Sequence, residues 1–189
     1  MNRTSFFCLV SAGVLAGCSS VSVNRDFDST FNFSQLKTYA WQHEMQPETG
    51  VPKIDNDLND KRIRAAVEQE LALKGFKKSD QAAADFKVAY FMDFQQRIDD
   101  RGSSMSVGVG RSSYGRAGSV GWSSGGMISD YEEAQLMIDI LNPENEEMVW
   151  RGRGRRRASD SSNPEKITAT VNDAVTRILK KFPPKQKKR

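Results

Sequence analysis

The residues of this 189-residue chain that are best suited to catalysis or metal binding are few. Cys8 and Cys18 are its two cysteines, both within the first eighteen residues, and His43 is its one histidine. Cys–His, Ser–His and multi-histidine zinc sites need further partners that this composition does not supply. A disulfide scaffold and a cysteine-based metal site are excluded for the same reason. The sequence therefore predicts no cofactor, no metal and a surface position for His43.

Cys18 lies at the end of a segment with the layout of a secretory signal peptide. Arg3 supplies a positive charge, residues 6–16 are mostly apolar, and the sequence LAGC occupies residues 15–18. LAGC resembles the bacterial lipobox, in which a peptidase cuts before the cysteine and lipid is attached to its sulfur and amine. We therefore expect cleavage between Gly17 and Cys18, with lipidated Cys18 as the first mature residue. The alternative is an ordinary signal peptide with a chance cysteine.

A lipid anchor on Cys18 would also determine the compartment. A single acyl chain gives marginal membrane binding, whereas two or more give stable attachment. Ser19 follows Cys18, and resemblance to enterobacterial sorting, where Asp at this position favours the inner membrane, points to the outer membrane. No later stretch approaches about 18 apolar residues, so we expect no transmembrane helix. The sequence predicts an outer-membrane lipoprotein that faces the periplasm and does not meet nucleic acid.

Five arginines within seven positions form the strongest candidate for binding, although the net charge of the chain is only +4; they are Arg151, Arg153, Arg155, Arg156 and Arg157. On a strand, Arg151, Arg153, Arg155 and Arg157 share one face, because side chains repeat every two residues. A row of guanidinium groups suits phosphates or carboxylates. Lipopolysaccharide, anionic lipid, peptidoglycan or an envelope protein would supply such groups. The alternative is a charged edge that prevents aggregation between sheets.

Carboxylates are the remaining candidates for acid–base chemistry. Asp26 and Asp28 are two residues apart and are predicted to lie on the same face of a strand. Further acids lie at turns and helix starts: Asp55, Asp57, Asp60, Asp99 and Asp100. Acids in such places ordinarily cap helices or increase solubility. We therefore predict that the protein is not an enzyme.

Residues 101–126 are rich in glycine and serine. Gly108 and Gly110 suggest a phosphate-binding loop, but the next glycine, Gly115, is five residues later and no helical pattern follows. Neither the dinucleotide fingerprint nor the P-loop is met. Alternating small and apolar residues predict a mobile β-hairpin instead, which could present an apolar surface to a partner or a membrane through Val107, Val109, Tyr114 and Trp122.

The elements that position these residues follow from periodicity. Apolar residues at helical spacing predict helices over residues 57–74 and from 164 onward, ended by Gly75 and by Pro183-Pro184. Alternation predicts strands near residues 21–24, 36–41, 85–94, 131–141 and 148–157. Each helix is apolar on one face only. The economical fold is α+β, with two helices packed on one face of a largely antiparallel sheet of five or six strands.

Two finer expectations concern the strands. Gly152 and Gly154 inside the last strand indicate a β-bulge or a close approach of another element. Trp41 and Trp150 lie in strand contexts and are expected in the core or at its rim.

Several segments in a fixed order resemble the DUF4136 lipoprotein family, and together they span roughly residues 18–182. They are VSVNRDFD, FSQLKTYAW, NDLNDKRIRAAVEQELALKGF, ADFKVAYFMDF and AQLMIDILNPENEEMVWRGRGR. The family has no agreed catalytic set, so the resemblance implies no active site. The expected organisation is a signal peptide over 1–17, one domain over 18–182 and a basic tail over 183–189. The expected function is a non-catalytic periplasmic interaction module, or alternatively a binding domain for an anionic envelope component.

Overall fold

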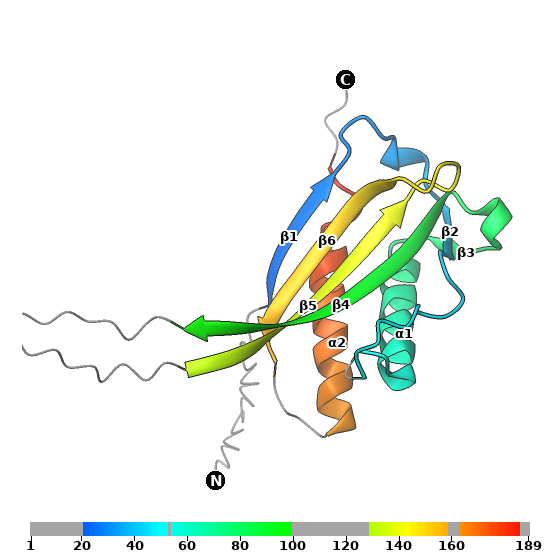
Figure 1. The fold of residues 1–189 in the computed structure, drawn as a ribbon. Helices are drawn as coiled ribbons and strands as arrows, with labels where there is room; N and C mark the ends of the chain where they lie inside the picture. The colour runs from blue at the N-terminus through cyan, green and yellow to red at the C-terminus, as the bar shows by residue number, and fades with distance from the viewer. Residues whose placement is uncertain (1–20, 53, 100–128, 159–162, 186–189) are drawn as a thin grey trace, which may run out of the picture.

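A computed structural model describes residues 21–52, 54–99, 129–158 and 163–185. Two helices and a six-stranded mixed sheet form an α+β fold, as the sequence predicted (Figure 1). The strands are β1 (Ser22–Phe27), β2 (Thr38–Trp41), β3 (Lys77–Lys78), β4 (Phe86–Asp99), β5 (Ser129–Leu141) and β6 (Met148–Arg157). The helices are α1 (Asp57–Leu73) and α2 (Pro164–Leu179), and short 3-10 turns cover Phe33–Gln35 and Gln81–Ala83. The predictions for Gly17, Cys18 and residues 101–126 lie outside the described residues.

The sheet has the strand order β1-β6-β5-β4-β2-β3. The pairs β1–β6, β6–β5 and β5–β4 are antiparallel, whereas β2 runs parallel to both β4 and β3. β5 pairs with β6 only as far as Glu133, but its pairing with β4 continues to Ser129. The far ends of β4 and β5 therefore form a two-stranded ribbon that projects beyond the rest of the sheet (Figure 1).

Side-chain caps determine where the two helices begin. The Asn56 side chain accepts hydrogen bonds from the backbone N–H groups of Leu58 and Asn59, at 2.9 and 3.3 Å. Asn56 is therefore the N-cap of α1. At the other end, Gly75 has a φ of +89°, a left-handed conformation that glycine adopts without steric cost. α2 begins in the same way, because Asn163 accepts from the Lys166 N–H at 2.9 Å.

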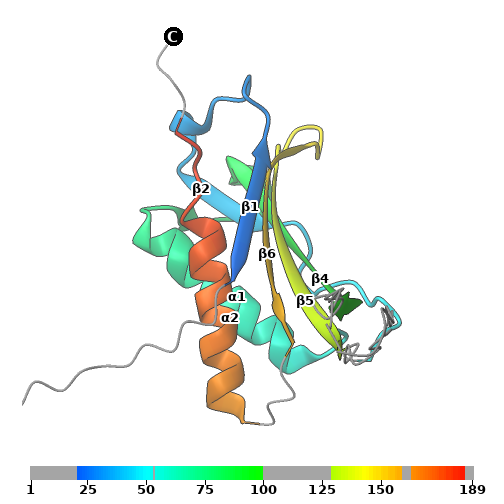
Figure 2. The ribbon, with the colours of Figure 1, turned by 90° about the vertical axis from the view of Figure 1, so that its left-hand side faces the viewer.

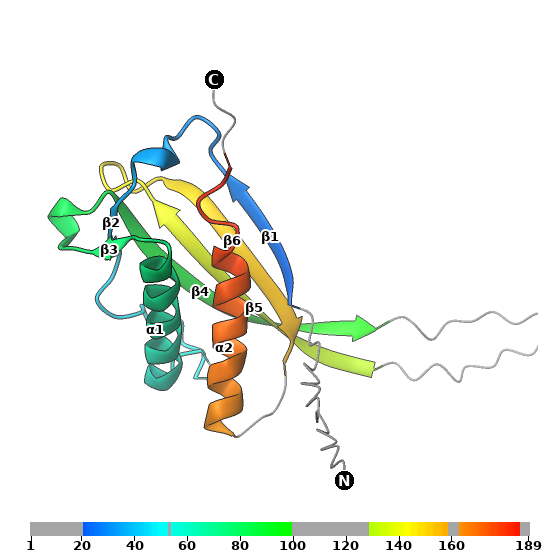
Figure 3. The same cartoon turned by 180° about the vertical axis from the view of Figure 1, so that it is seen from behind.

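Both helices lie on one face of the sheet (Figures 2 and 3). The core between them contains an aromatic cluster made of Phe33, Phe76, Phe86, Trp150 and Phe182. Phe182 lies beyond the end of α2 but is only 1% exposed, and its ring centroid is 5.2 Å from that of Trp150 and 5.6 Å from that of Phe86. The chain after α2 is thereby held against the sheet. Trp41 and Trp150 are both buried, in agreement with the sequence.

The glycines of β6 mark the place where α2 approaches the sheet most closely. A Cβ atom on Gly152 would overlap the Trp150 ring and come within 2.5 Å of Ile178 Cγ2. A Cβ atom on Gly154 would lie 3.0 Å from Ile178 Cδ1. Close approach, and not a bulge, is therefore the reason for both glycines. The one irregularity in the β5–β6 register lies elsewhere, between Ile140 and Leu141.

This packing predicts that Gly152→Ala is destabilising by about 2 kcal/mol, because the added methyl overpacks the contact between Trp150 and Ile178. Urea denaturation of the purified protein measures the loss. Gly154→Ala is the matched control, with a smaller loss, because its nearest contact is longer and involves the end of a side chain. Equal effects of the two substitutions would contradict the account.

Candidate functional site: the open face of the sheet

Figure 2 shows the sheet face opposite the two helices, which we call the open face. Gly152 and Gly154 point toward α2, so strand alternation places the odd-numbered arginines of β6 on the other side: Arg151, Arg153, Arg155 and Arg157. The neighbours of Arg151, Arg153 and Arg155 on β1 are Asp26, Asn24 and Ser22. The four arginines thus share one face, but they are not equivalent.

Arg151 is engaged in a bidentate ion pair with Asp139. Its Nε and Nη2 atoms donate to the two carboxylate oxygens at 2.7 and 2.6 Å. Asp139 is only 2% exposed and lies directly opposite Arg151 in the β5–β6 register. Its hydrogen bond to Asp139 raises the pKa of Arg151. Since a buried carboxylate needs a partner, Arg151 serves the sheet itself and is not available to a ligand.

Arg153 and Arg155 differ from Arg151, because neither has a carboxylate partner among the described residues. The Nε atom of Arg153 is buried and donates no hydrogen bond to any described group. The side chains opposite them on β5 are Met137 and Gln135, which are uncharged. Phe91 on β4 lies opposite Met137 in the β4–β5 pairing and is 43% exposed. The centre of the open face therefore combines two unpaired cations with exposed apolar surface.

Arg157 and Arg156 have different surroundings again. The Arg157 guanidinium lies 4.6 Å from the centroid of the Tyr131 ring, a cation–π distance. Arg156 is on the helix side of the sheet, at a small apolar cavity of about 70 Å³ between β5, β6 and α2. Arg156 is therefore not part of the row.

The chemistry of the open face follows from the spacing of Arg153 and Arg155. Their Cα atoms are about 7 Å apart, since a strand rises 3.3–3.4 Å per residue. Guanidinium groups at that separation can hold two phosphates or carboxylates, or one group between them. Met137 and Phe91 beside them can contact the apolar part of the same ligand.

The structure separates the acids that the sequence grouped together. Asp26 is on β1, but Asp28 lies just past the strand, where its carboxylate accepts from the Thr30 hydroxyl and N–H, both at 2.7 Å. These bonds lower the pKa of Asp28. Asp55 accepts from the N–H groups of Thr49 and Gly50, which also lower its pKa. Asp28 and Asp55 therefore stabilise turns. His43 has an exposed side chain, as expected.

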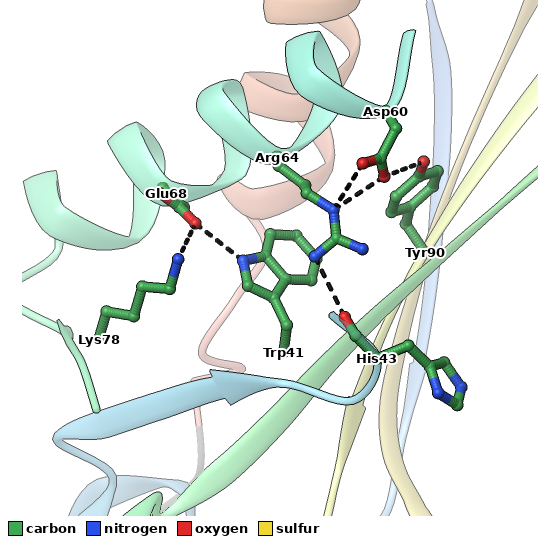
Figure 4. Close-up of polar contacts among 7 residues, drawn as sticks. All are labelled: Trp41, His43, Asp60, Arg64, Glu68, Lys78 and Tyr90. Atoms are coloured by element: carbon green, nitrogen blue, oxygen red, sulfur yellow. Dashed lines mark hydrogen bonds and ion pairs between the residues drawn. The ribbon is translucent and has the colours of Figure 1, made fainter. Parts of the chain in front are cut away.

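Asp60 belongs to a polar cluster that fastens α1 to the sheet (Figure 4). Its carboxylate accepts two bonds from Arg64 Nε, at 2.8 and 3.0 Å, and one from the Tyr90 hydroxyl at 2.7 Å. The Arg64 guanidinium lies 4.5 Å from the centroid of the Trp41 ring. The Trp41 N–H donates to Glu68 at 2.8 Å, and Lys78 donates to the same oxygen at 2.7 Å.

The electrostatics of this cluster indicate structural pairing. Burial is the largest influence on Glu68 and favours its neutral form, but the hydrogen bonds from Lys78 and Trp41 outweigh burial and lower its pKa. Burial, assisted by the nearby Glu68, raises the pKa of Tyr39 to about 12. Burial and the bond to Asp60 raise the pKa of Tyr90 as well. Tyr39 and Tyr90 therefore stay protonated, and Glu68 stays charged, across the physiological pH range.

Sequence reasoning missed two contributors to the open face, Asp139 and Phe91. The signal for Asp139 was present: a turn at residues 142–147 puts it twelve positions before Arg151, opposite it in a hairpin. Phe91 was assigned to a strand, and alternation puts it on the face opposite the buried Tyr90. Its place beside Met137 depends on a register that only the paired strands reveal. Among the described residues, no helix is long and apolar enough to span a membrane, and no three metal-binding side chains cluster.

Fold and surface together define a class: an α+β domain with one face of its sheet covered by two helices and the other carrying arginines. The chain belongs to the family described as Domain of unknown function (DUF4136), whose model matches residues 23–184. A comparison with curated proteins gave no match.

The chain was also compared with solved structures. A PDZ domain protein from Parabacteroides distasonis aligns with a TM-score of 0.51 at 14% identity, over 88% of this chain and 36% of that chain. This chain therefore spans about a third of the length of that protein. The PelC dodecamer from Paraburkholderia phytofirmans aligns with a TM-score of 0.48 at 10% identity, over 88% of this chain and 100% of that chain. The likeness to the first concerns the fold alone.

The contrast between Arg151 and Arg153 gives a prediction for stability. Arg151→Met leaves the buried Asp139 carboxylate without its partner and lowers the free energy of unfolding by about 3 kcal/mol. Arg153→Met leaves no buried acid behind and changes it by less than about 1 kcal/mol. Urea denaturation compares the two variants.

The double variant Arg151→Met/Asp139→Leu is the internal control, because it removes both charges and recovers most of the loss. Equal losses for the two single variants, or no recovery in the double variant, would show that the ion pair has no special role.

Proposed function

We propose that this chain is a lipid-anchored, non-catalytic binding module of the cell envelope, and that its contact surface is the open face. The observation that carries the proposal is the pair Arg153 and Arg155, which no described carboxylate neutralises, on a sheet face that neither α1 nor α2 covers. Arg151, Arg64 and Lys78, by contrast, each form an ion pair with a carboxylate. Unpaired arginines beside exposed apolar side chains are typical of a recognition surface.

The anchor in this proposal is Cys18, with cleavage after Gly17. The support is the sequence LAGC behind an apolar run, and Ser19 favours the outer membrane, with the domain in the periplasm. Membership of the DUF4136 family accounts for the domain that follows.

The anchor is tested by metabolic labelling. Radiolabelled palmitate is expected in the wild-type protein and absent from Cys18→Ala, because the thiol is the site of lipid attachment. The matched control is Cys8→Ala, which removes the other cysteine and keeps the label. Equal labelling of wild type and Cys18→Ala would show that Cys18 is not the site of lipid attachment.

A second candidate function concerns the ligand. The unpaired guanidiniums of Arg153 and Arg155 favour an anionic envelope component, such as lipopolysaccharide, anionic lipid or peptidoglycan, over a neutral protein partner. Such binding weakens as salt rises, because ions screen exposed charges beyond about 8 Å at physiological ionic strength.

We therefore expect the acylated protein to retain anionic envelope extract at low salt and to release it at about 0.5 M NaCl. Arg153→Ala/Arg155→Ala removes most of the retention. Lys61→Ala/Lys166→Ala, which takes two charges from the exposed surface of the helices, leaves it intact. Retention that is insensitive to salt and to the arginines would favour an apolar protein contact.

A further inference from the structure

The register of β1 places the arginines close to the start of the folded domain. β1 begins at Ser22, and Ser22 lies opposite Arg155 in the β1–β6 pairing. Asn24 lies opposite Arg153, and Asp26 opposite Arg151. Because β1 and β6 are antiparallel, Arg155 is nearer to the N-terminal side than Arg151. The two unpaired arginines therefore occupy the end of the open face from which the chain leads back toward Cys18.

The distance from that end to the proposed anchor is short. Ser22 is four positions after Cys18, and a fully extended chain covers at most about 3.6 Å per residue step, or about 14 Å in all. Neighbouring strands add about 5 Å. Arg155 therefore lies within about 20 Å of the lipidated residue along this path, whatever conformation the linking residues take. A domain held so closely cannot move far from the bilayer surface.

The open face also has the chemistry that an anionic bilayer surface requires. Its unpaired cations, Arg153 and Arg155, suit lipid phosphates, which accept bidentate hydrogen bonds from guanidinium groups. Phe91, 43% exposed, and Met137 lie beside them and can contact the acyl boundary. Asp139 is neutralised by Arg151 and does not repel a phosphate. The other acids beside the row, Asp26 and Glu133, lie opposite Arg151 and Arg157, and not opposite Arg153 or Arg155.

From this juxtaposition we propose that the ligand of the open face is the anionic headgroup layer of the same bilayer that holds the anchor. The domain then lies with its sheet against the membrane and its helices toward the periplasm. This inference rests on the proposed anchor at Cys18, and it names the source of the anionic groups. Each basic residue near an anionic surface strengthens attachment about five-fold, so two give about 25-fold.

Single-cysteine probes test the orientation. An introduced cysteine would be the only free thiol of the mature chain, because Cys18 would be acylated and Cys8 removed with the signal peptide. Asn24→Cys places a bimane label at an exposed position of β1, opposite Arg153. Gln69→Cys places it at an exposed position of α1, in the helix layer. The acylated proteins are reconstituted in vesicles containing 30% phosphatidylglycerol and a lipid with a nitroxide on its headgroup. Such a nitroxide quenches bimane only at short range.

The expected result is strong quenching at position 24 and weak quenching at position 69, with at least a three-fold difference. The difference disappears in pure phosphatidylcholine vesicles and in Arg153→Gln/Arg155→Gln. It persists in Lys61→Gln/Lys166→Gln, which removes the same charge from the helix layer. Equal circular dichroism spectra and melting temperatures confirm that each variant is folded, and Ser22→Cys serves as a second probe of the open face.

Failure of the anchor and failure of the orientation give different results. A protein that does not float with vesicles overturns the anchor, and the orientation with it. A protein that floats but shows equal quenching at the two positions, or a difference that ignores the arginines, overturns the orientation and leaves the anchor standing. In that case the open face is available to a soluble partner.

Discussion

The close contact between α2 and β6 is the constraint on which the rest of the molecule depends. Gly152 and Gly154 let Ile178 and Trp150 occupy the space that side chains would otherwise fill. The two-residue period of a strand then puts every intervening residue on the opposite side. One alternating sequence, RGRGR, therefore accounts for both the close approach of α2 and the arginine row on the opposite face. The α2 helix packs closely because alternate positions have no side chain, and the open face is cationic because the remaining positions carry guanidinium groups.

The ion pair between Arg151 and Asp139 has a second consequence beyond neutralising a buried acid. It joins β5 to β6 directly opposite one another, and a slip of one residue would move Asp139 to the helix side among apolar groups. The pair therefore specifies register as well as charge. On the other side of the sheet, the cluster around Trp41 and Arg64 does the corresponding work for α1. The ion pair thus fixes the sheet, the cluster fixes α1 to the sheet, and the aromatic core packs between the sheet and the helices.

Much of this could be predicted from the sequence, because the long elements have strong periodicity. The α1 helix, β5 and β6 match their expected bounds within about two residues, and the one-sided helix packing follows from their apolar stripes. β3 could not be predicted, since Lys77 and Lys78 are two exposed lysines without a pattern. The sequence also did not reveal that Arg151 has a carboxylate partner whereas Arg153 and Arg155 have none among the described residues. It depends on which β5 residue lies opposite each one, and a pairing register is a property of two strands, whereas periodicity is read from one.

The ribbon formed by the far ends of β4 and β5 bears on how such a domain can diversify. Its pairs, such as Arg97 with Tyr131, lie outside the region where β6 joins β5, and they contribute nothing to the aromatic core. Changes at that end of the molecule therefore leave the packing of the core unaltered. Insertions or deletions between the two strands can accumulate in evolution without a folding penalty, and a new epitope or label can be grafted there by design. The domain thus separates a packed body from an end that its core does not constrain.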